Sequence, residues 1–214
     1  MSITRVKFCG MTRARDVEAA VEIGANAVGF ICYARSPRYV APDRLKELAR
    51  ALPPFVTPVL LFVNAAEADV MCALEVVPDA VLQFHGDETP EQCARFARPF
   101  LRALRMENGV DLLDCERKYA SAVGLLADAL AEGYGGSGRS FDWSMLPARQ
   151  VRSKPLVLAG GLTAASVGRA IQAVRPFAVD VASGVEESPG TKSVAKMREF
   201  FAAVRAADSA LEQP

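Results

Sequence analysis

The sequence predicts a single-domain α/β fold, a closed (β/α)₈ barrel of the TIM-barrel type. Eight short runs rich in apolar and β-branched residues alternate with segments of helical periodicity along the chain. Most of these runs are almost continuously apolar, as expected of parallel strands that helices cover. The 214 residues can bury a full core as one domain, and no linker divides them. We expect the barrel to span residues 1–207, followed by a frayed polar tail at 208–214.

The elements follow in a regular order. Strands are predicted at 4–9, 27–32, 57–64, 80–85, 100–106, 122–128, 155–161 and 178–184. Helices are predicted at 17–23, 42–51, 66–76, 89–97, 111–120 and 167–174, and a last one from 193 with a buried stripe of Val194, Met197, Phe201 and Val204. A glycine-rich segment (133–143) replaces the helix after strand six. An open doubly wound sheet is the alternative, but eight evenly spaced strands in this length favour a barrel.

Composition excludes several classes of function. Acidic and basic residues are equal in number, 25 each, which argues against binding to nucleic acid. No apolar stretch approaches membrane-spanning length, so no membrane association is predicted. Five cysteines without a CxxC motif are typical of a reduced, cytoplasmic protein. His85 is the only histidine, which excludes multi-histidine metal sites, and no metal is predicted.

Two glycine-containing turns follow adjacent strands near the end of the chain. Gly160 and Gly161 lie between strand seven and a helix, and Ser183 and Gly184 follow strand eight. Glycines let backbone N–H groups approach an anion, and phosphate binds near strands seven and eight in many barrels. Either pair alone also fits a plain turn, but two on adjacent strands favour a phosphate site.

Cys9 ends strand one and Asp128 ends strand six, where catalytic residues of such barrels lie. The two strands are not neighbours, so the two groups can face a substrate from different sides. Such a pair suits a general base and a general acid better than a nucleophile and its activator. The alternatives are a buried thiol and a helix-capping or loop-bracing carboxylate. A buried thiol is the expectation for the remaining cysteines, Cys32, Cys72, Cys93 and Cys115.

Six segments together carry a family resemblance: KFCGMT, GFICYARSPRYV, LQFHGDE, GGSGRSFDW, LAGGLTAASV and VDVASGVEESPGTKS. In this order the sequence resembles the phosphoribosylanthranilate isomerases of tryptophan biosynthesis. The resemblance implies a cofactor-free Amadori rearrangement of the small-molecule substrate N-(5-phosphoribosyl)anthranilate to 1-(2-carboxyphenylamino)-1-deoxyribulose 5-phosphate. It also implies that Cys9 is the general base, Asp128 the general acid, and Arg38 the group that holds the anthranilate carboxylate.

The sequence departs from the family at three positions near these residues. Phe8 stands where isoleucine is usual, Ala127 where leucine is usual, and Ala182 where serine is common. The first two are packing changes. The third removes one hydroxyl from the phosphate loop and leaves its backbone donors in place.

Further polar residues of the strands are candidates for the site. Gln83 and His85 share one side of strand four and are expected to reach the substrate, although a structural role fits them equally well. Asp180 on strand eight is expected to bind a ribose hydroxyl. Lys7 shares the inward side of Cys9, and a buried ion pair with Asp180 is its expected role. The GGSG segment (135–138) either closes over the ligand or forms a surface turn.

Three other functions remain open from the residues alone. An indoleglycerol-phosphate synthase-like lyase would need a catalytic lysine and carboxylate set that the strand ends do not obviously supply. A non-catalytic barrel that binds a phosphorylated metabolite would not need both proton-transfer residues. A thiol hydrolase with a Cys9–His85 dyad would need contact between strands one and four, which a closed barrel separates. A monomer or a homodimer is expected.

Overall fold

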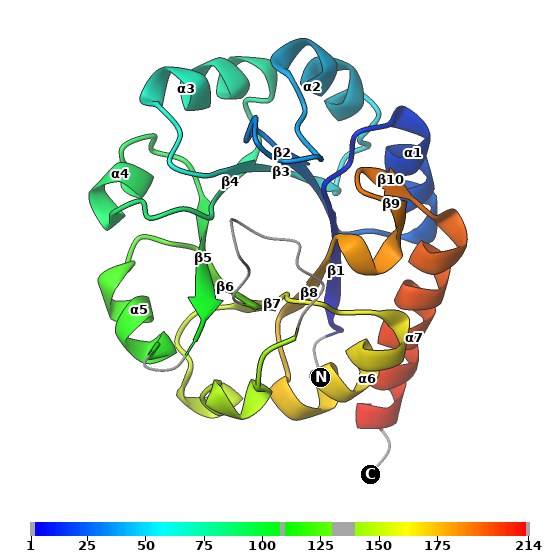
Figure 1. Ribbon diagram of the computed structural model, residues 1–214. Coiled ribbons are helices and arrows are strands. Elements are labelled where there is room, and N and C mark those ends of the chain that lie inside the picture. Colours follow the sequence, from blue (N-terminus) through cyan, green and yellow to red (C-terminus); the bar gives the residue numbers. More distant parts are fainter. Residues whose placement is uncertain (1–2, 108–109, 130–139, 213–214) are drawn as a thin grey trace.

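The structure, a computed structural model, describes residues 3–107, 110–129 and 140–212. Eight parallel strands form a closed barrel in sequence order, and β8 pairs with β1 (Figure 1). The strands are β1 (Arg5–Cys9), β2 (Ala27–Ile31), β3 (Thr57–Phe62), β4 (Val81–Phe84), β5 (Phe100–Met106), β6 (Gly124–Ala129), β7 (Leu156–Leu158) and β8 (Ala178–Val181). Each matches a predicted strand, and the predicted (β/α)₈ barrel is confirmed.

Helices surround the barrel wall (Figure 1). They are α1 (Ala14–Ile23), α2 (Pro42–Ala49), α3 (Glu67–Val76), α4 (Pro90–Ala94), α5 (Leu112–Lys118), α6 (Ala164–Val174) and α7 (Val194–Glu212). Between β6 and β7 the described residues, from 140 onward, hold only the short 3₁₀ helices η1 (Trp143–Met145) and η2 (Arg149–Val151). This agrees with the predicted replacement of a helix there. The predicted GGSG segment (135–138) lies outside the described residues.

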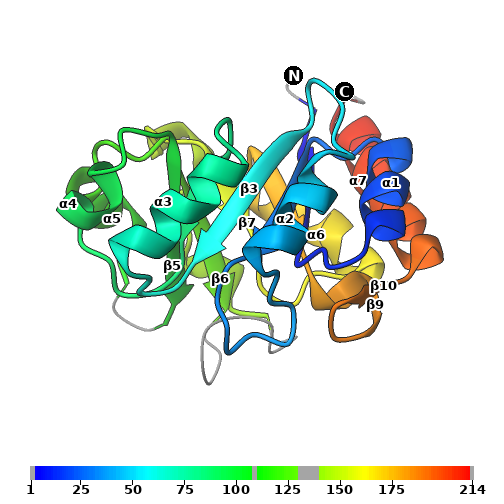
Figure 2. The same cartoon turned by 90° about the horizontal axis from the view of Figure 1, so that it is seen from above.

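A small hairpin follows the last strand of the barrel. It consists of a 3₁₀ helix, η3 (Ser183–Val185), and the antiparallel strands β9 (Glu186–Ser188) and β10 (Thr191–Lys192). The hairpin lies at the end of the barrel where the strands finish, whereas both chain termini lie at the opposite end (Figure 2). None of the helices in the described ranges is long and apolar enough to cross a membrane.

The buried face of α7 differs from the prediction at two positions. Phe200 is fully buried, whereas Phe201 is only partly buried and Val194 is exposed. The ring of Phe200 packs edge-on against that of Phe8 on β1, with ring centroids 6.2 Å apart. The aromatic residue at position 8 is therefore matched by an aromatic residue on the helix that covers it.

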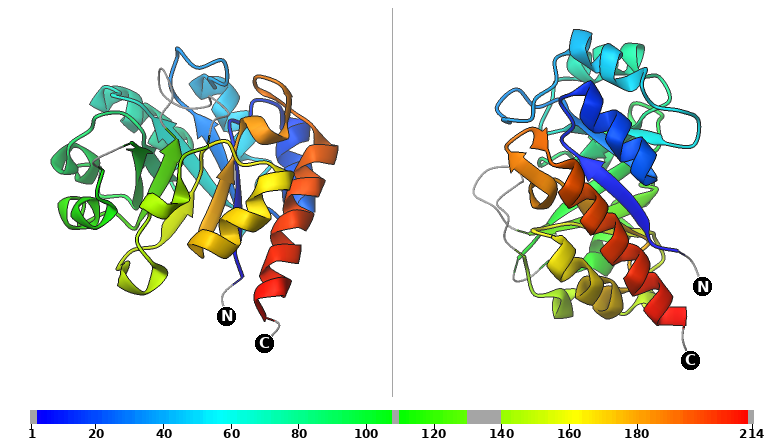
Figure 3. Two further views of the ribbon diagram at one scale, coloured as in Figure 1. Left: turned by 60° about the horizontal axis from the view of Figure 1, so that its bottom comes forward. Right: turned by 90° about the vertical axis from the view of Figure 1, so that its right-hand side faces the viewer.

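The predicted frayed tail is also wrong over most of its length, because α7 continues beyond Ala207 to Glu212. Asp208 accepts hydrogen bonds from the backbone N–H and the hydroxyl of Thr4, at 3.0 and 2.6 Å. Helix α7 packs along α6 and α1, which brings its end beside the start of β1 (Figure 3). The end of α7 is therefore held by its contact with the N-terminal segment, which the polar sequence of residues 208–214 did not indicate.

Candidate active site

Cys9 is the last residue of β1, and its side chain points into the barrel. It is 4% exposed and packs in a small apolar cluster with Ile31, Leu61 and Val63. Burial raises the pKa of the Cys9 thiol. The positive charge of Lys7 lowers this pKa, and the negative charge of Asp180 raises it. Burial dominates, so Cys9 is a neutral thiol in the free protein at neutral pH.

Lys7 and Asp180 form an ion pair below Cys9. The two residues are register partners on β1 and β8, and Lys7 Nζ lies 2.9 Å from Asp180 Oδ1. Burial by itself would lower the pKa of Lys7, but the charges of Asp180 and Cys9 raise it above its ordinary value. Lys7 therefore remains a cation inside the barrel, and the expected ion pair is confirmed.

Asp128 lies on β6, and each of its carboxylate oxygens lies close to a polar neighbour. Oδ1 accepts from the backbone N–H of Ala129 at 2.8 Å, and Oδ2 lies 3.2 Å from His85 Nε2. The other ring nitrogen of His85, Nδ1, lies 3.2 Å from Gln83 Nε2. The two candidates on the fourth strand are thus joined to the candidate acid, a contact that the sequence did not indicate.

Arg38, in the loop after β2, is buried rather than solvated. Its Nε and Nη2 donate to the two carboxylate oxygens of Glu186 at 2.8 and 2.7 Å. Lys192 also donates to Glu186, at 2.8 Å, and to the carbonyl oxygen of Ala182 at 3.0 Å. The hydrogen bonds to Glu186 raise the pKa of Arg38. The second Arg38 terminal nitrogen, Nη1, takes no part in the pair.

Sequence reasoning missed both Glu186 and Lys192. Burial would raise the pKa of Glu186, but its bonds to Arg38 and Lys192 hold this pKa below its ordinary value. The signal was present in the segment GVEESPGTKS, where charged residues follow the phosphate-type turn after β8. Among the described charged groups beside Cys9, three cations (Lys7, Arg38 and Lys192) accompany two anions (Asp180 and Glu186). Such an excess of positive charge favours an anionic ligand.

The two glycine turns meet at the ends of β7 and β8. Gly160 and Gly161 have φ values of +84° and +61°, which favour glycine. A methyl group on Gly160 would lie 2.6 Å from the backbone nitrogen of Ala129, and one on Gly184 would clash with the carbonyl oxygen of Leu162. The loop after β8, with Ser183 and Gly184 in η3, therefore packs directly on the loop that leads into α6.

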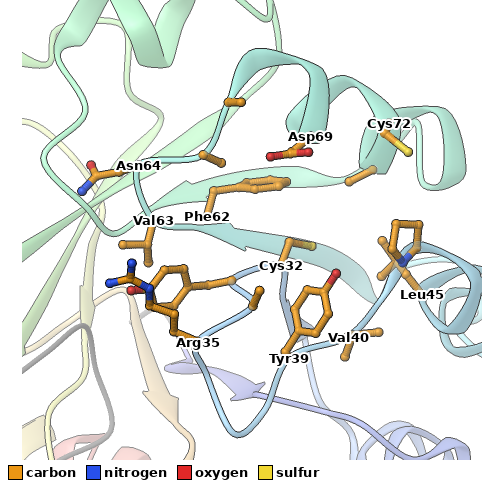
Figure 4. Close-up of a pocket in the computed structure, with 16 residues that line it drawn as sticks. Cys32, Arg35, Tyr39, Val40, Leu45, Phe62, Val63, Asn64, Asp69 and Cys72 are labelled. Carbon is orange, nitrogen blue, oxygen red and sulfur yellow. The ribbon is translucent and has the colours of Figure 1, made fainter.

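A cavity of about 410 Å³ opens beside the barrel mouth, between α2 and α3. Cys32, Tyr39, Asp69 and Cys72 are among the side chains that line it (Figure 4). It shares Val63 with the apolar cluster around Cys9. The expectation of a buried thiol is wrong for Cys72, which is exposed on α3. Burial raises the pKa of Cys32 to about 12, so this thiol stays neutral.

The arrangement is suited to proton transfer rather than to nucleophilic catalysis. Cys9 and Asp128 lie at the same end of the barrel on separate strands, and the glycine turns of β7 and β8 lie between those strands in the closed order. His85 contacts Gln83 and Asp128, and Cys9 is influenced by Lys7, so these described residues do not form the Cys9–His85 dyad of a thiol hydrolase.

Comparisons with known proteins place the chain in one family. The sequence model described as "N-(5'phosphoribosyl)anthranilate (PRA) isomerase" matches residues 6–203. The N-(5'-phosphoribosyl)anthranilate isomerase of Leptothrix cholodnii is 54% identical over 206 residues, which cover 96% of this chain and 93% of that protein.

Solved structures give the same result. Phosphoribosyl anthranilate isomerase from Thermotoga maritima superimposes with a TM-score of 0.85 and 40% identity, covering 95% of this chain and 99% of that chain. A phosphoribosyl anthranilate isomerase in complex with reduced 1-(o-carboxyphenylamino)-1-deoxyribulose 5-phosphate superimposes with a TM-score of 0.82 and 36% identity, with coverage of 95% and 99%. The chain therefore belongs to the family of N-(5'-phosphoribosyl)anthranilate isomerases.

Proposed function

We propose that this protein catalyses the Amadori rearrangement of N-(5-phosphoribosyl)anthranilate to 1-(2-carboxyphenylamino)-1-deoxyribulose 5-phosphate in tryptophan biosynthesis. The observation that carries the proposal is the pairing of Cys9 and Asp128 at one end of the barrel, in a chain that belongs to this family. The small-molecule complex of the related structure supports a substrate of this class.

The reaction requires one proton donor and one proton acceptor. Asp128 gives a proton to the furanose oxygen, the bond from this oxygen to C1′ breaks, and the ring opens to a Schiff base. Cys9, as the thiolate, then removes the proton from C2′, which gives an enolamine that tautomerises to the ketone. Because burial raises the pKa of Cys9, the thiolate is the scarcer form at neutral pH, and the positive charge of Lys7 offsets part of this cost.

The two ends of the substrate carry negative charge, and the site offers a binding group to each. The backbone amides around Gly161, Ser183 and Gly184, with Gly160 in the same turn, take the phosphate. Arg38 takes the anthranilate carboxylate through Nη1, the terminal nitrogen that Glu186 does not use, so the substrate need not displace Glu186. Asp180 contributes to the ribose subsite through its position below Cys9.

A direct assay tests this proposal. Purified protein without added metal or cofactor is expected to remove the fluorescence of phosphoribosylanthranilate, with formation of the ketose phosphate detected by mass spectrometry. Protein that binds this substrate without consuming it would favour the non-catalytic barrel. Release of carbon dioxide, with an indole product, would favour the lyase.

We also propose that two copies of the chain associate through the end of the barrel opposite the active site. The loop before β3 lies at this end of the barrel (Figure 2). Its residue Phe55 is fully exposed and has a φ of +72°. Beside it lies a hollow of about 670 Å³ lined by prolines and by apolar side chains such as Leu52, Val76 and Val77. In a two-fold pair, each Phe55 can enter the hollow of the other copy.

Light scattering after size exclusion tests this association. The protein is expected to elute as a dimer, and Phe55→Ser as a monomer. Met71→Ser, which replaces a partly exposed apolar side chain on α3, is the matched control and should stay dimeric. A monomeric wild-type protein at micromolar concentration would contradict the proposal.

The five free thiols support a reducing compartment, which we propose to be the cytoplasm.

A further inference from the structure

Three side chains in successive close contact extend from β4 to β6. Gln83 Nε2 lies 3.2 Å from His85 Nδ1, and His85 Nε2 lies 3.2 Å from Asp128 Oδ2. Gln83 is 0% exposed and His85 is 7% exposed. Gln83 therefore cannot touch a ligand without rearrangement, and its neighbour in the folded protein is the histidine.

The hydrogen bond between Gln83 and His85 fixes the position of one proton. An amide nitrogen can only donate, so His85 Nδ1 accepts and carries no proton. In the neutral imidazole the proton is then on Nε2, the atom that lies 3.2 Å from Asp128 Oδ2. The tautomer of His85 thus follows from the orientation of Gln83.

This orientation of the Gln83 amide leaves its oxygen atom without a hydrogen bond in the described part of the chain. Gln83 Oε1 is buried and has no hydrogen-bond partner among the described residues. Turning the amide over would pair Oε1 with Nδ1, but only if Nδ1 carried the proton, and Nε2 of the neutral ring would then present a lone pair instead of an N–H group to Asp128. An unpaired Oε1 is tolerated because the alternative removes the donor that faces Asp128.

We propose that Gln83 and His85 are positioning residues for the proposed acid, with Gln83 holding His85 in the Nε2–H tautomer so that it donates to Asp128. This inference rests on the proposed function. As Asp128 gives its proton to the ring oxygen, negative charge develops on its carboxylate, and the hydrogen bond from His85 becomes stronger. A donor that acts mainly on the transition state raises kcat and has little effect on KM.

Because His85 is the only histidine in the chain, ¹⁵N labelling of histidine gives one imidazole to observe. In buffer alkaline enough for neutral imidazole, the wild-type spectrum should have a protonated Nε2 and an unprotonated Nδ1. Gln83→Met keeps the side-chain length and removes the amide, and should give a mixture of tautomers. Leu101→Met is the matched control, since Leu101 is the β5 register partner of Gln83, and should keep the wild-type spectrum.

Kinetics then test the effect on Asp128. Gln83→Met should lower kcat by about 3- to 30-fold with KM nearly unchanged, the loss expected for a weakened charge-assisted hydrogen bond. His85→Gln retains an amide donor that has no tautomers. In that background the added Gln83→Met change should have no further effect on kcat.

A protonated Nδ1 in the wild-type protein would overturn the inference. An equal loss of kcat from Gln83→Met in the wild-type and His85→Gln backgrounds would also overturn it, because a residue with only a structural role would lower kcat equally in both. A lost tautomer preference with unchanged kcat would overturn the positioning role. Asp128→Asn is measured in parallel. If this variant is active, the proposed function itself has failed. If it is inactive, the results above concern only the positioning role of Gln83 and His85.

Discussion

Gly29 on β2 is the register partner of Cys9 on β1, and its lack of a side chain provides the space for the thiol. A methyl group on Gly29 would lie 2.8 Å from Cys9 Sγ and 3.1 Å from Lys7 Nζ. The first separation requires the thiol to move, the second is unusually tight, and the backbone of Cys9 is itself close, at 3.2 Å. The position of the proposed base therefore depends on a glycine that performs no chemistry.

We expect Gly29→Ala to displace the Cys9 thiol and to lower kcat at least about 10-fold, with a loss of about 1–3 kcal/mol in the free energy of unfolding from overpacking. Gly168→Ala is the control, because a methyl group there meets nothing closer than 3.9 Å and α6 gains a better helix former. Steady-state kinetics and urea unfolding measure the two effects. Normal turnover by Gly29→Ala would mean that the thiol position is not critical.

The charge of Asp180 provides a second test of the thiol. Since Asp180 is one of the causes that raise the pKa of Cys9, Asp180→Asn should lower it, and the thiolate should form at lower pH than in the wild type. The rate of Cys9 alkylation by iodoacetamide against pH, followed by mass spectrometry of the Cys9 peptide, measures this shift. Asp208→Asn removes a carboxylate at the other end of the barrel and should leave the profile unchanged. A shift to higher pH would contradict the assignment of charges.

The raised pKa of Cys9 also predicts the pH dependence of the reaction. The proposed base acts as a thiolate, and burial moves thiolate formation to higher pH. In the wild type, the share of Cys9 present as thiolate should therefore rise with pH above neutrality, and Cys9→Ser should remove the part of the pH dependence of kcat/KM that this ionisation causes. A kcat/KM profile of the same shape in wild type and Cys9→Ser would argue against Cys9 as the base.

The elements of the fold could be predicted because each strand is a compact apolar run that its neighbours bury on both faces. The errors arose where a partner far along the chain decides the outcome. Phe200 rather than Phe201 faces inward because it packs on Phe8, and α7 continues past Ala207 because Asp208 binds Thr4. The periodicity of apolar residues along one segment does not indicate either of these contacts.

The positions of the candidate residues along the strands could be predicted, but the contacts between their side chains could not. Strand ends placed Cys9 and Asp128 at the mouth, and strand parity indicated the Lys7–Asp180 pair, since β1 and β8 are neighbours in a closed barrel. The contact of His85 with Asp128 joins strands that are not neighbours, and the bond of Arg38 to Glu186 joins two loops. Such contacts depend on side-chain direction inside the barrel, which spacing along the chain does not specify.

Arg38 should discriminate between ligands that differ only in the anthranilate carboxylate. Arg38→Ala is expected to weaken binding of the carboxylate-bearing product about 10- to 150-fold, the value of a hydrogen bond between charged groups, and to weaken a ribulose phosphate without the carboxylate much less. Because the change also leaves Glu186 without its partner, calorimetric titrations should be accompanied by a measurement of stability. Equal losses for both ligands would mean that Arg38 only braces the loop through Glu186.

Stability should depend on pH through Glu186. Its folded-state pKa is lowered by Arg38 and Lys192, so its contribution to the free energy of unfolding is present above the unfolded-state pKa. This contribution should be lost as the pH falls through the folded-state value. Glu186→Gln should therefore flatten the dependence of Tm on pH in the acidic range, whereas Glu199→Gln, at an exposed position on α7, should leave it nearly unchanged. Parallel acid dependence in wild type and Glu186→Gln would contradict this role.

Cys9 and Asp128 supply the decisive test of the proposed chemistry. Cys9→Ser should keep the fold and the affinity for inorganic phosphate, because the glycine turns are untouched, but a serine hydroxyl does not ionise near neutral pH. Asp128→Asn should be equally impaired, because an amide cannot give a proton to the ring oxygen. A positioned acid or base contributes about 10²–10⁴-fold, so each change should cost at least about 3 kcal/mol in the barrier. Cys72→Ser, the same substitution at an exposed cysteine on α3, should retain wild-type turnover. Near-normal turnover by Cys9→Ser would show that the thiol at the end of β1 is only part of the packing, and the proton acceptor would have to be sought among the other groups at the mouth.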